Sequence, residues 1–245
     1  MISKKIPPQY EAIYKSLKPR FDLARIGGYR DGGYVLPYKV ILNAKNLISG
    51  GVGSNARFEA DCLDINPLLD ITLIDKSYSP IRVILRLIYH FFQKREKGLI
   101  SLVEAASTFR VLKNSKLIKK FLDDSFSLNQ IFNNTKVIES IVKLDIEGSE
   151  YSQLSSILEH EKSIIGLCIE FHDLDQHHNL LKLKKFIEET SFELIFVSIN
   201  EASFENGVPS CLELSFSRKE SVQAIDNSYL QASTFPGELT CCYYG

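Results

Sequence analysis

The chain has 245 residues, 44% of them hydrophobic, which is enough for one domain with a real core. Its formal net charge of −1 excludes a general attraction to polyanions. No uninterrupted apolar stretch reaches the roughly 18 residues that cross a membrane, and the first residues lack the apolar run of a signal peptide. The five cysteines lack the even number and spacing of a disulfide framework, so we expect reduced thiols and a cytoplasmic protein.

The N-terminal part predicts a small extension, residues 1–40, ahead of a main domain at 41–245. Residues 9–18 predict a short helix that Pro19 ends. Two short apolar runs follow within residues 23–37, and they flank Asp31-Gly32-Gly33. Acid-glycine pairs between apolar runs are typical of a β-hairpin, which we predict here.

Residues 46–55 predict a strand, a glycine-rich turn and the start of a helix. A second strand, residues 71–75, ends in Asp75. The number of residues from Gly53 to Asp75 is close to the roughly 20 that separate a glycine loop from a ribose-binding carboxylate. Glycines let the backbone approach a ligand closely, and the acid accepts hydrogen bonds from ribose hydroxyls. The turn is Gly-Gly-Val-Gly, which differs from the dinucleotide-binding Gly-x-Gly-x-x-Gly.

A long helix is predicted at residues 80–97. Its polar residues form a narrow stripe on an otherwise apolar cylinder; they are Arg82, Arg86, His90, Gln93 and Lys94. Either this helix is buried in the core, or it meets a partner or a lipid surface. Residues 76–120 contain eleven Lys/Arg and two Glu, a net charge of +9. Either this charge attracts an anionic acceptor or the membrane that carries it, or it only keeps this edge of the domain soluble.

The middle of the chain leads to the most informative strand. We predict a third strand at 99–105, a lysine-rich helix or loop at 109–122, and a capped helical turn at 127–132. Residues 141–146 predict a buried parallel strand that delivers Asp145 and Glu147 to its carboxyl end, where ligands of open α/β sheets bind. Gly148 breaks the strand and a helix follows from Tyr151. A solvated turn with helix-capping acids is the alternative.

The next strand, residues 164–173, also ends in polar residues, Glu170, His172 and Asp173. An amphipathic helix follows at 180–190, and two further strands at 192–199 and 211–217 form an antiparallel edge on the parallel sheet. Alternating strands and helices of this kind predict an α/β fold.

Several strings together resemble class I S-adenosylmethionine-dependent methyltransferases, and more narrowly the FkbM family. They are Lys143-Leu-Asp-Ile-Glu-Gly-Ser-Glu150, the preceding Ser-Leu-Asn-Gln-Ile-Phe, Ile169-Glu-Phe-His172, the Asp-Gly-Gly-Tyr-Val segment at 31–35 and the Gly-Gly-Val-Gly turn at 50–53. The likeness covers roughly residues 25 to 216. It implies a Rossmann-like seven-stranded, mostly parallel sheet with helices on both faces and a C-terminal antiparallel hairpin.

The resemblance also implies an activity, the transfer of a methyl group from S-adenosylmethionine to a hydroxyl, commonly on a sugar or a secondary metabolite. We expect a sugar or glycan here. The residues that the resemblance places at the cofactor are Gly50, Gly51, Gly53, Ser54, Asp75 and Ser107. Those that we assign to the acceptor are Asp31, Glu147 and Asn200. The stretch from Val197 to Ala202 keeps only Asn200 of a His-x-His-x-Asn-Asn string found in relatives, which leaves the acceptor contacts open.

Two mechanisms fit the polar strand ends. In the first, His172 is the general base and Asp145 orients the acceptor. In the second, Asp145 together with Glu170 or His172 holds a divalent metal, Mg²⁺ or Mn²⁺, which binds the sugar oxygens. A nucleotide-binding α/β protein without this activity and a degenerate methyltransferase scaffold are the rival functions.

The expected partner is a sugar or glycan acceptor, lipid- or nucleotide-linked, with peripheral membrane contact through residues 76–120 as an open alternative. A nucleic-acid partner is not expected, because basic and aromatic residues are not interleaved in a readout motif.

Overall fold

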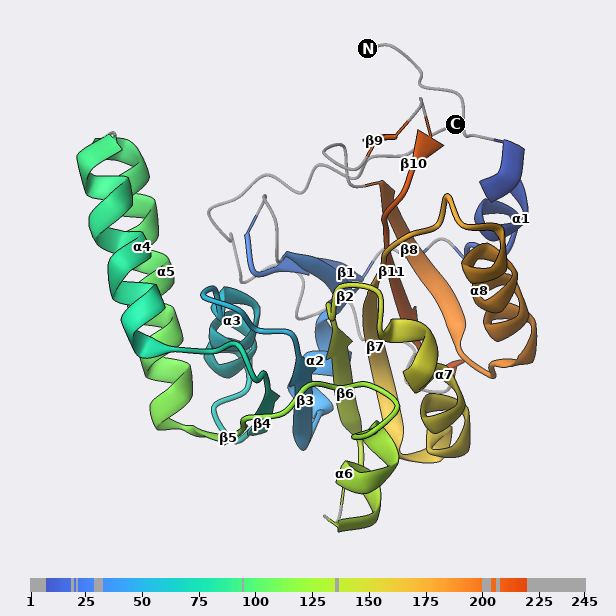
Figure 1. Ribbon diagram of the computed structural model, residues 1–245. Coiled ribbons are helices and arrows are strands. Elements are labelled where there is room, and N and C mark those ends of the chain that lie inside the picture. The colour runs from blue at the N-terminus through green and yellow to red at the C-terminus, as the bar shows by residue number, and fades with distance from the viewer. Residues whose placement is uncertain are drawn as a thin grey trace.

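A seven-stranded sheet forms the centre of the computed structural model, which describes residues 8–18, 20, 22–28, 33–93, 95–134, 137–199, 204–205 and 208–219 (Figure 1). The strands lie in the order β5 (Ser115–Ile118), β4 (Asp70–Ile74), β3 (Asn46–Gly50), β6 (Ser140–Leu144), β7 (Ile164–Phe171), β11 (Leu212–Ser217) and β8 (Glu193–Ile199). β11 runs antiparallel to both of its neighbours, β7 and β8, and the other neighbouring pairs of this sheet are parallel. The predicted mostly parallel sheet with a C-terminal antiparallel hairpin is confirmed.

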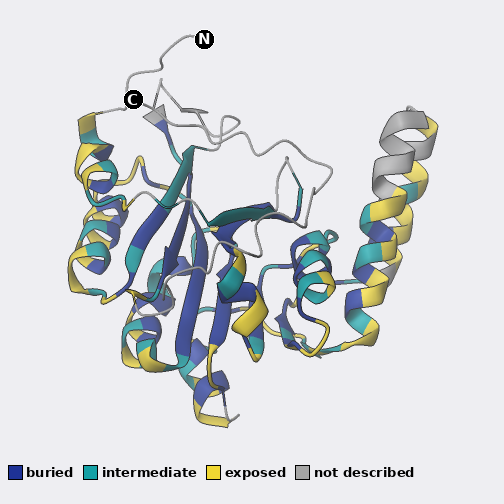
Figure 2. Ribbon diagram, turned by 180° about the vertical axis from the view of Figure 1, so that it is seen from behind, coloured by how far each residue is buried: buried dark blue, intermediate teal, exposed yellow. Residues whose placement is uncertain are grey.

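Helices cover both faces of this sheet, and an apolar cluster fills each side. Adjacent residues of a strand point to opposite faces, so Leu47 joins one cluster and Ile48 the other. The Ile48 side is covered by α6 (Leu128–Asn134), α7 (Glu150–Glu159) and α8 (His177–Glu189). The Leu47 side is covered by α2 (Tyr38–Asn43) and α3 (Arg57–Ile65). Figure 2 shows the strands between these layers as the most deeply buried part of the molecule.

The described residues of the predicted N-terminal extension form a helical turn and a hairpin. The 3₁₀ turn η1 (Pro8–Tyr10) leads into α1 (Glu11–Lys15), which confirms the short helix. Strands β1 (Leu23–Ile26) and β2 (Tyr34–Pro37) pair antiparallel, so the predicted hairpin is also confirmed. Tyr34 and Leu36 belong to the same apolar cluster as Leu47, so this hairpin packs against the sheet.

Two small elements complete the described chain. A second 3₁₀ turn, η2 (Glu161–Ser163), connects α7 to β7. Between β8 and β11, β9 (Phe204–Glu205) and β10 (Val208–Pro209) form a short antiparallel pair. None of the helices among the described residues is both long enough and apolar enough to cross a membrane.

The largest departure from the sequence prediction is a pair of long helices. The chain forms α4 (Pro80–Gln93) and then α5 (Arg95–Lys113), so the predicted strand at 99–105 is wrong and these residues are helical. The third strand is the shorter β5, which follows α5. In Figure 1, α4 and α5 lie side by side beyond the edge strand β5, and most of their length extends away from the sheet. The last turns of α5 pack against the domain, where Val111 belongs to the Leu47-side cluster.

Candidate active site at the carboxyl edge of the sheet

The order of the strands reverses between β3 and β6. From β3 the chain moves outward through β4 to β5, and it then returns to the other side of β3 to build β6 and β7. Ligands of open α/β sheets bind at the carboxyl ends of the strands beside such a reversal. The turns that follow β3, β4, β6 and β7 are therefore the place to look for a site.

The glycine turn after β3 lies directly against the end of β6. Gly51 has φ +75°, and a Cβ on it would lie 1.6 Å from the carbonyl oxygen of Asp145, so only glycine fits here. Gly53 also has a positive φ, +58°, but a Cβ on it would meet nothing within 4 Å. Gly51 thus serves close packing, whereas Gly53 faces open space.

Asp75, after β4, fixes this turn in place. Its side chain is buried, and its Oδ2 accepts a hydrogen bond of 2.6 Å from the Gly53 backbone N–H. Its Oδ1 accepts bonds from the Ser77 N–H and hydroxyl, at 2.6 and 2.7 Å, and from the Tyr78 N–H at 3.0 Å. Glycine turn and carboxylate come together as predicted from their spacing. A ribose hydroxyl would have to share or replace one of these donors.

Helix α5 touches the glycine turn through Thr108. The Thr108 hydroxyl accepts a bond from the Ala56 N–H, at 3.1 Å, and lies 3.3 Å from the Ser54 carbonyl oxygen. Thr108 is fully buried, whereas the neighbouring Ser107, which the resemblance places near the adenine, is only partly buried. Thr108 was not predicted as a site residue, because nothing in the local sequence pattern marks it.

Asp145, after β6, is held by two side chains that the sequence analysis did not select. Lys143 Nζ lies 3.7 Å from Asp145 Oδ2 and donates a bond of 3.0 Å to the Gly51 carbonyl oxygen. The Tyr34 hydroxyl donates to the same Oδ2 at 3.4 Å. Lys143 is nearly buried, so this ammonium group links Asp145 to the glycine turn.

His172, after β7, is surrounded by carboxylates. Its Nδ1 lies 2.9 Å from Oε1 of the buried Glu150. Its Nε2 lies 3.7 Å from Glu147 Oε2 and 4.0 Å from Asp145 Oδ1. The structure therefore brings Asp145, Glu147 and His172 together from the ends of neighbouring strands.

The carboxylates change the protonation of His172. Burial alone lowers the pKa of His172. The hydrogen bond and charge of Glu150 outweigh this effect, aided by the charges of Glu170 and Asp145, and raise the pKa to about 9. At neutral pH His172 is thus an imidazolium and a proton donor. It can act as a base only when another positive charge nearby lowers its pKa.

Among the described residues, two groups of three have donor atoms within 4.8 Å of one another and could hold a cation, and both include His172. One is Asp145, Glu147 and His172, and the other is Glu170, His172 and Cys211. The first contains the oxygen ligands that Mg²⁺ and Mn²⁺ prefer. Glu170 belongs to the second group with the thiol of Cys211, which donates to its Oε1 at 2.9 Å. Burial, followed by the charge of Glu170, raises the pKa of Cys211, which keeps it a thiol.

Two of the predicted acceptor residues, Asp31 and Asn200, lie outside the described residues. The third, Glu147, has φ +54°, a left-handed conformation that is uncommon for residues other than glycine. Its side chain is 87% exposed and it lies beside His172. Glu147 is therefore available to a ligand at this edge.

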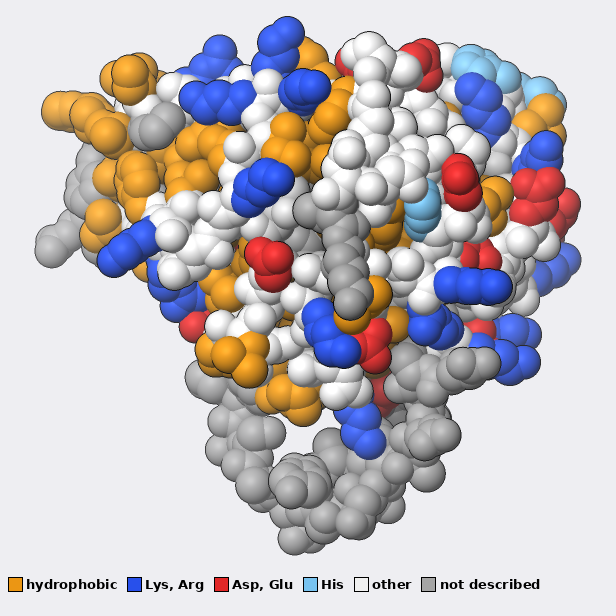
Figure 3. All heavy atoms as spheres, turned by 90° about the horizontal axis from the view of Figure 1, so that it is seen from below, with side chains coloured by type: hydrophobic (Ala, Val, Ile, Leu, Met, Phe, Trp, Pro, Cys, Tyr) orange, Lys and Arg blue, Asp and Glu red, His pale blue; other side chains and the backbone are white. Residues whose placement is uncertain are grey.

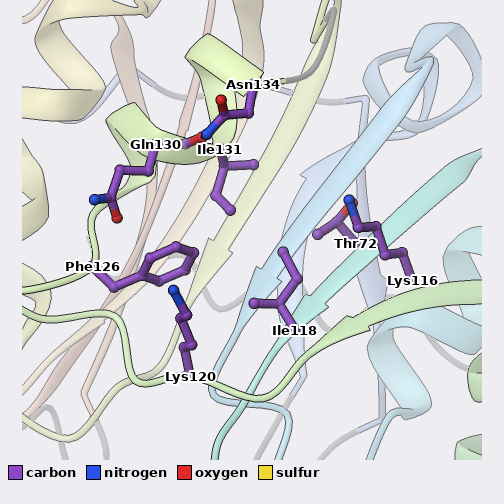
Figure 4. A pocket seen from close by; sticks show the side chains of 8 residues that line it. All are labelled: Thr72, Lys116, Ile118, Lys120, Phe126, Gln130, Ile131 and Asn134. Carbon is purple, nitrogen blue, oxygen red and sulfur yellow. The ribbon is translucent and has the colours of Figure 1, made fainter.

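A separate hollow of about 190 Å³ lies against one face of the sheet (Figure 4). It is lined from β4, the segment around β5, and α6, and Lys120 Nζ there lies 4.4 Å from the centre of the Phe126 ring. It shares no residue with the two polar clusters above, and its floor is strand residues such as Thr72. The candidate site is thus the polar carboxyl edge and not this hollow.

Comparison with known proteins gives similarity at the level of the fold. No protein-family model matches the chain, and no curated protein matches it. Solved structures with a similar fold include the pre-rRNA processing protein fibrillarin of Methanococcus jannaschii, with 13% identity, a TM-score of 0.42, and 81% of this chain and 83% of that chain covered. Aeropyrum pernix fibrillarin with bound S-adenosyl-L-methionine has 10% identity and a TM-score of 0.42, and the match covers 79% of this chain and 84% of that chain. The precorrin-6y C5,15-methyltransferase of Geobacter metallireducens has 11% identity and a TM-score of 0.38, and the match covers 74% of this chain and 84% of that chain.

Proposed function

We propose that this protein is an S-adenosylmethionine-dependent O-methyltransferase that acts on a hydroxyl of a sugar or glycan. The observation that carries the proposal is the position of Gly53. This residue faces open space beside the reversal of strand order and is bonded to Asp75, 22 residues further along the chain. The Asp145–His172 cluster lies at the ends of the adjoining strands.

The residues around Gly53 suit a cofactor with a ribose and an amino acid part. Gly53 and the partly buried Ser54 present backbone at an open surface, which favours close approach of a ligand. Both carboxylates already hold this turn, Asp75 through the Gly53 N–H and Asp145 through Lys143, so a ribose hydroxyl would share or replace one of the donors to Asp75. Bound there, S-adenosylmethionine would supply an electrophilic methyl group on a sulfonium.

The acceptor hydroxyl must lose its proton as it attacks the methyl group, because a sugar hydroxyl is a poor nucleophile. Asp145 is fixed by Lys143 and Tyr34 and is positioned to accept a hydrogen bond from that hydroxyl. His172 is the group that takes the proton, provided that positive charge in the loaded site lowers its pKa from about 9. A divalent cation held by Asp145, Glu147 and His172 is the alternative activator. Inhibition by EDTA and rescue by Mg²⁺ or Mn²⁺ would favour the cation.

The sugar acceptor rests on the resemblance to FkbM-like proteins carried by residues 143–150 and 169–172. The exposed Glu147 beside His172 supports it, since carboxylates commonly bind sugar hydroxyls by accepting their hydrogen bonds. A lipid- or nucleotide-linked sugar fits the basic segment at 76–120 best.

Cofactor binding is tested by calorimetric titration with S-adenosylhomocysteine. Asp75→Ala should weaken binding by about 1–3 kcal/mol, the scale of a lost hydrogen-bonding partner with charge. Gly53→Asn is the sharper variant, because asparagine tolerates a positive φ and its side chain would fill the open space. We expect it to fold and to lose binding. Leu181→Ser, an exposed change on α8, is the control that should bind like the wild type.

Catalysis is tested with Asp145→Asn and His172→Gln. Each should lower turnover by roughly 10²–10⁴ with little change in cofactor affinity. Near-normal turnover of the double variant would contradict these roles. No binding of S-adenosylhomocysteine by the wild type, with binding of another nucleotide, would instead favour the rival nucleotide-binding protein.

A further inference from the structure

Helix α4 exposes an apolar face of large side chains. The helix is 14 residues long, and its exposed apolar residues recur at helical spacing along a single stripe. These residues are Ile81, Ile84, Leu85, Ile88, Tyr89 and Phe92. Phe92 is 88% exposed and Ile81 68% exposed, so the stripe faces solvent and the core-helix interpretation is wrong for these residues.

The opposite side of α4 holds it against α5. Val83 is buried and belongs to a small apolar cluster with Tyr78 and with Ala105 of α5. Two more exposed apolar residues, Leu102 and Val103, lie on α5 itself. Figures 1 and 2 show the pair of helices extending away from the sheet for most of its length, with much of its described surface exposed. An exposed apolar stripe of this size on a soluble domain marks a site of interaction.

Positive charge accompanies the stripe. Arg82 lies on α4 beside it and is exposed, as are Lys76 ahead of α4 and Lys113 at the end of α5. The other exposed lysines of the basic segment, 116, 119 and 120, lie on β5 and directly after it. The segment from 76 to 120 has a net charge of +9 in the sequence. Figure 3 shows hydrophobic side chains gathered on this side of the molecule with Lys and Arg beside them. Apolar bulk next to basic residues is the pattern of helices that lie in the interface of a membrane with anionic lipids.

We propose that the apolar face of α4 docks this protein on the surface of an anionic lipid bilayer. A second copy of the chain fits less well. Two copies packed through this stripe would bring the same positive charges together, whereas an anionic bilayer neutralises them. The helix is too short to cross the bilayer and would lie parallel to its surface.

The position of α4 links docking to the candidate site. The helix begins at Pro80, on the segment that follows Asp75 at the carboxyl end of β4. In Figure 1, α4 and α5 extend to the side of the sheet on which the carboxyl ends of β3 and β6 lie. Docking would thus hold that edge near lipid head groups, where a lipid-linked acceptor is found. Docking itself does not depend on the proposed methyl transfer and is measured without cofactor.

The test is flotation of the full chain with two kinds of vesicle, phosphatidylcholine alone and phosphatidylcholine with one third phosphatidylglycerol. We expect binding to the anionic vesicles that weakens at high salt. The variant Ile84→Ser/Ile88→Ser/Phe92→Ser should lose binding at least tenfold. The matched control, Leu68→Ser/Leu181→Ser, changes apolar residues that are exposed elsewhere and should bind like the wild type. Circular dichroism checks that both variants fold.

Three results would overturn the proposal. They are no binding of the wild type to anionic vesicles, equal binding to both kinds of vesicle, and unchanged binding of the triple variant. Light scattering adds a direct check on the competing occupant. A dimer that the triple variant dissociates, without vesicle binding by the wild type, would assign the stripe to a second copy instead.

Discussion

At the scale of single residues, the carboxylates around His172 have different tasks. Glu150 is fully buried, and its Oε1 accepts hydrogen bonds from the backbone N–H groups of Ile146 and Gly148, at 3.0 and 3.2 Å, besides contacting His172. It shapes the turn after β6 and orients the imidazole. Glu147 and Asp145 face the other ring nitrogen and are more open to a ligand. In the proposed mechanism Asp145 and Glu147 contact the ligand beside His172, and Glu150 holds the turn that carries them.

The two positive-φ glycines of the turn after β3 should respond differently to alanine. Gly51→Ala places a Cβ 1.6 Å from a backbone oxygen, so the ends of β3 and β6 must separate, and we expect a loss of several kcal/mol of unfolding free energy. Gly53→Ala meets no atom within 4 Å and should cost only the left-handed conformation, about 1–2 kcal/mol. Urea unfolding of both variants measures the difference. Equal losses would contradict this division of roles.

At the scale of elements, the strands that carry the site were predictable. Residues 46–50, 141–144 and 164–171 are apolar runs that end in glycine or acid, and all three are buried parallel strands near their predicted positions. Their neighbours in the sheet follow from the alternation of strands and helices and from the family resemblance. The hairpin at 23–37 was predictable from the acid-glycine pair between its strands.

The third strand was not predictable, because its signal is weak. Residues 99–105 are a short apolar run that suits either a strand or a helix, and the long helix α5 includes them. The real strand, β5, has only four residues with a mixed Ser-Lys-Leu-Ile sequence and lies at the edge of the sheet. An edge strand with one neighbour needs less apolar surface, so its sequence is less distinctive.

Only part of the candidate site was predictable from the sequence. Asp75, Asp145 and His172 follow strands directly, and position along the chain is enough to select them. Tyr34 reaches Asp145 from a hairpin 111 residues away, which only the tertiary structure shows. Lys143 does carry a signal in the sequence, because it is a charged residue inside a strand that is otherwise apolar and fully buried. Buried charges are retained when they are paired, and here the partners are Asp145 and the Gly51 carbonyl.

The contact between α5 and the glycine turn gives a prediction at this scale. Thr108→Val keeps the shape of the side chain but leaves the buried Ala56 N–H without its acceptor, so we expect a loss of about 1–3 kcal/mol in stability. It should also weaken S-adenosylhomocysteine binding, because the turn is held less firmly. Ser107→Ala is the matched control on the adjacent residue. It should leave stability unchanged, and its effect on affinity tests directly the placement of Ser107 near the adenine.

At the scale of the whole molecule, stability should depend on the protonation of His172. A histidine with a pKa of about 9 when folded and about 6.5 when unfolded binds more protons in the folded state between these values. Its stabilisation is complete below about pH 6.5 and is lost as the pH rises through about 9. The unfolding free energy should therefore fall by up to about 1.4 kcal/mol per pH unit within this window.

Denaturant unfolding at several pH values from 6 to 9 measures this slope, and His172→Gln should flatten it. Glu150→Gln should reduce the slope, because it lowers the pKa of His172. Glu147→Asn is the control: it removes an exposed carboxylate, asparagine tolerates the positive φ, and the slope should change little. Burial raises the pKa of the Cys62, Cys168 and Cys211 thiols. Ionisation of these thiols in the unfolded state lowers stability mainly above about pH 8.5, the ordinary range of a thiol. Between about pH 6.5 and 7.5, a pH unit below the ordinary thiol range, the loss of stability is therefore assigned to His172, and an equal slope in His172→Gln within that window would show that this imidazole is not held as a cation.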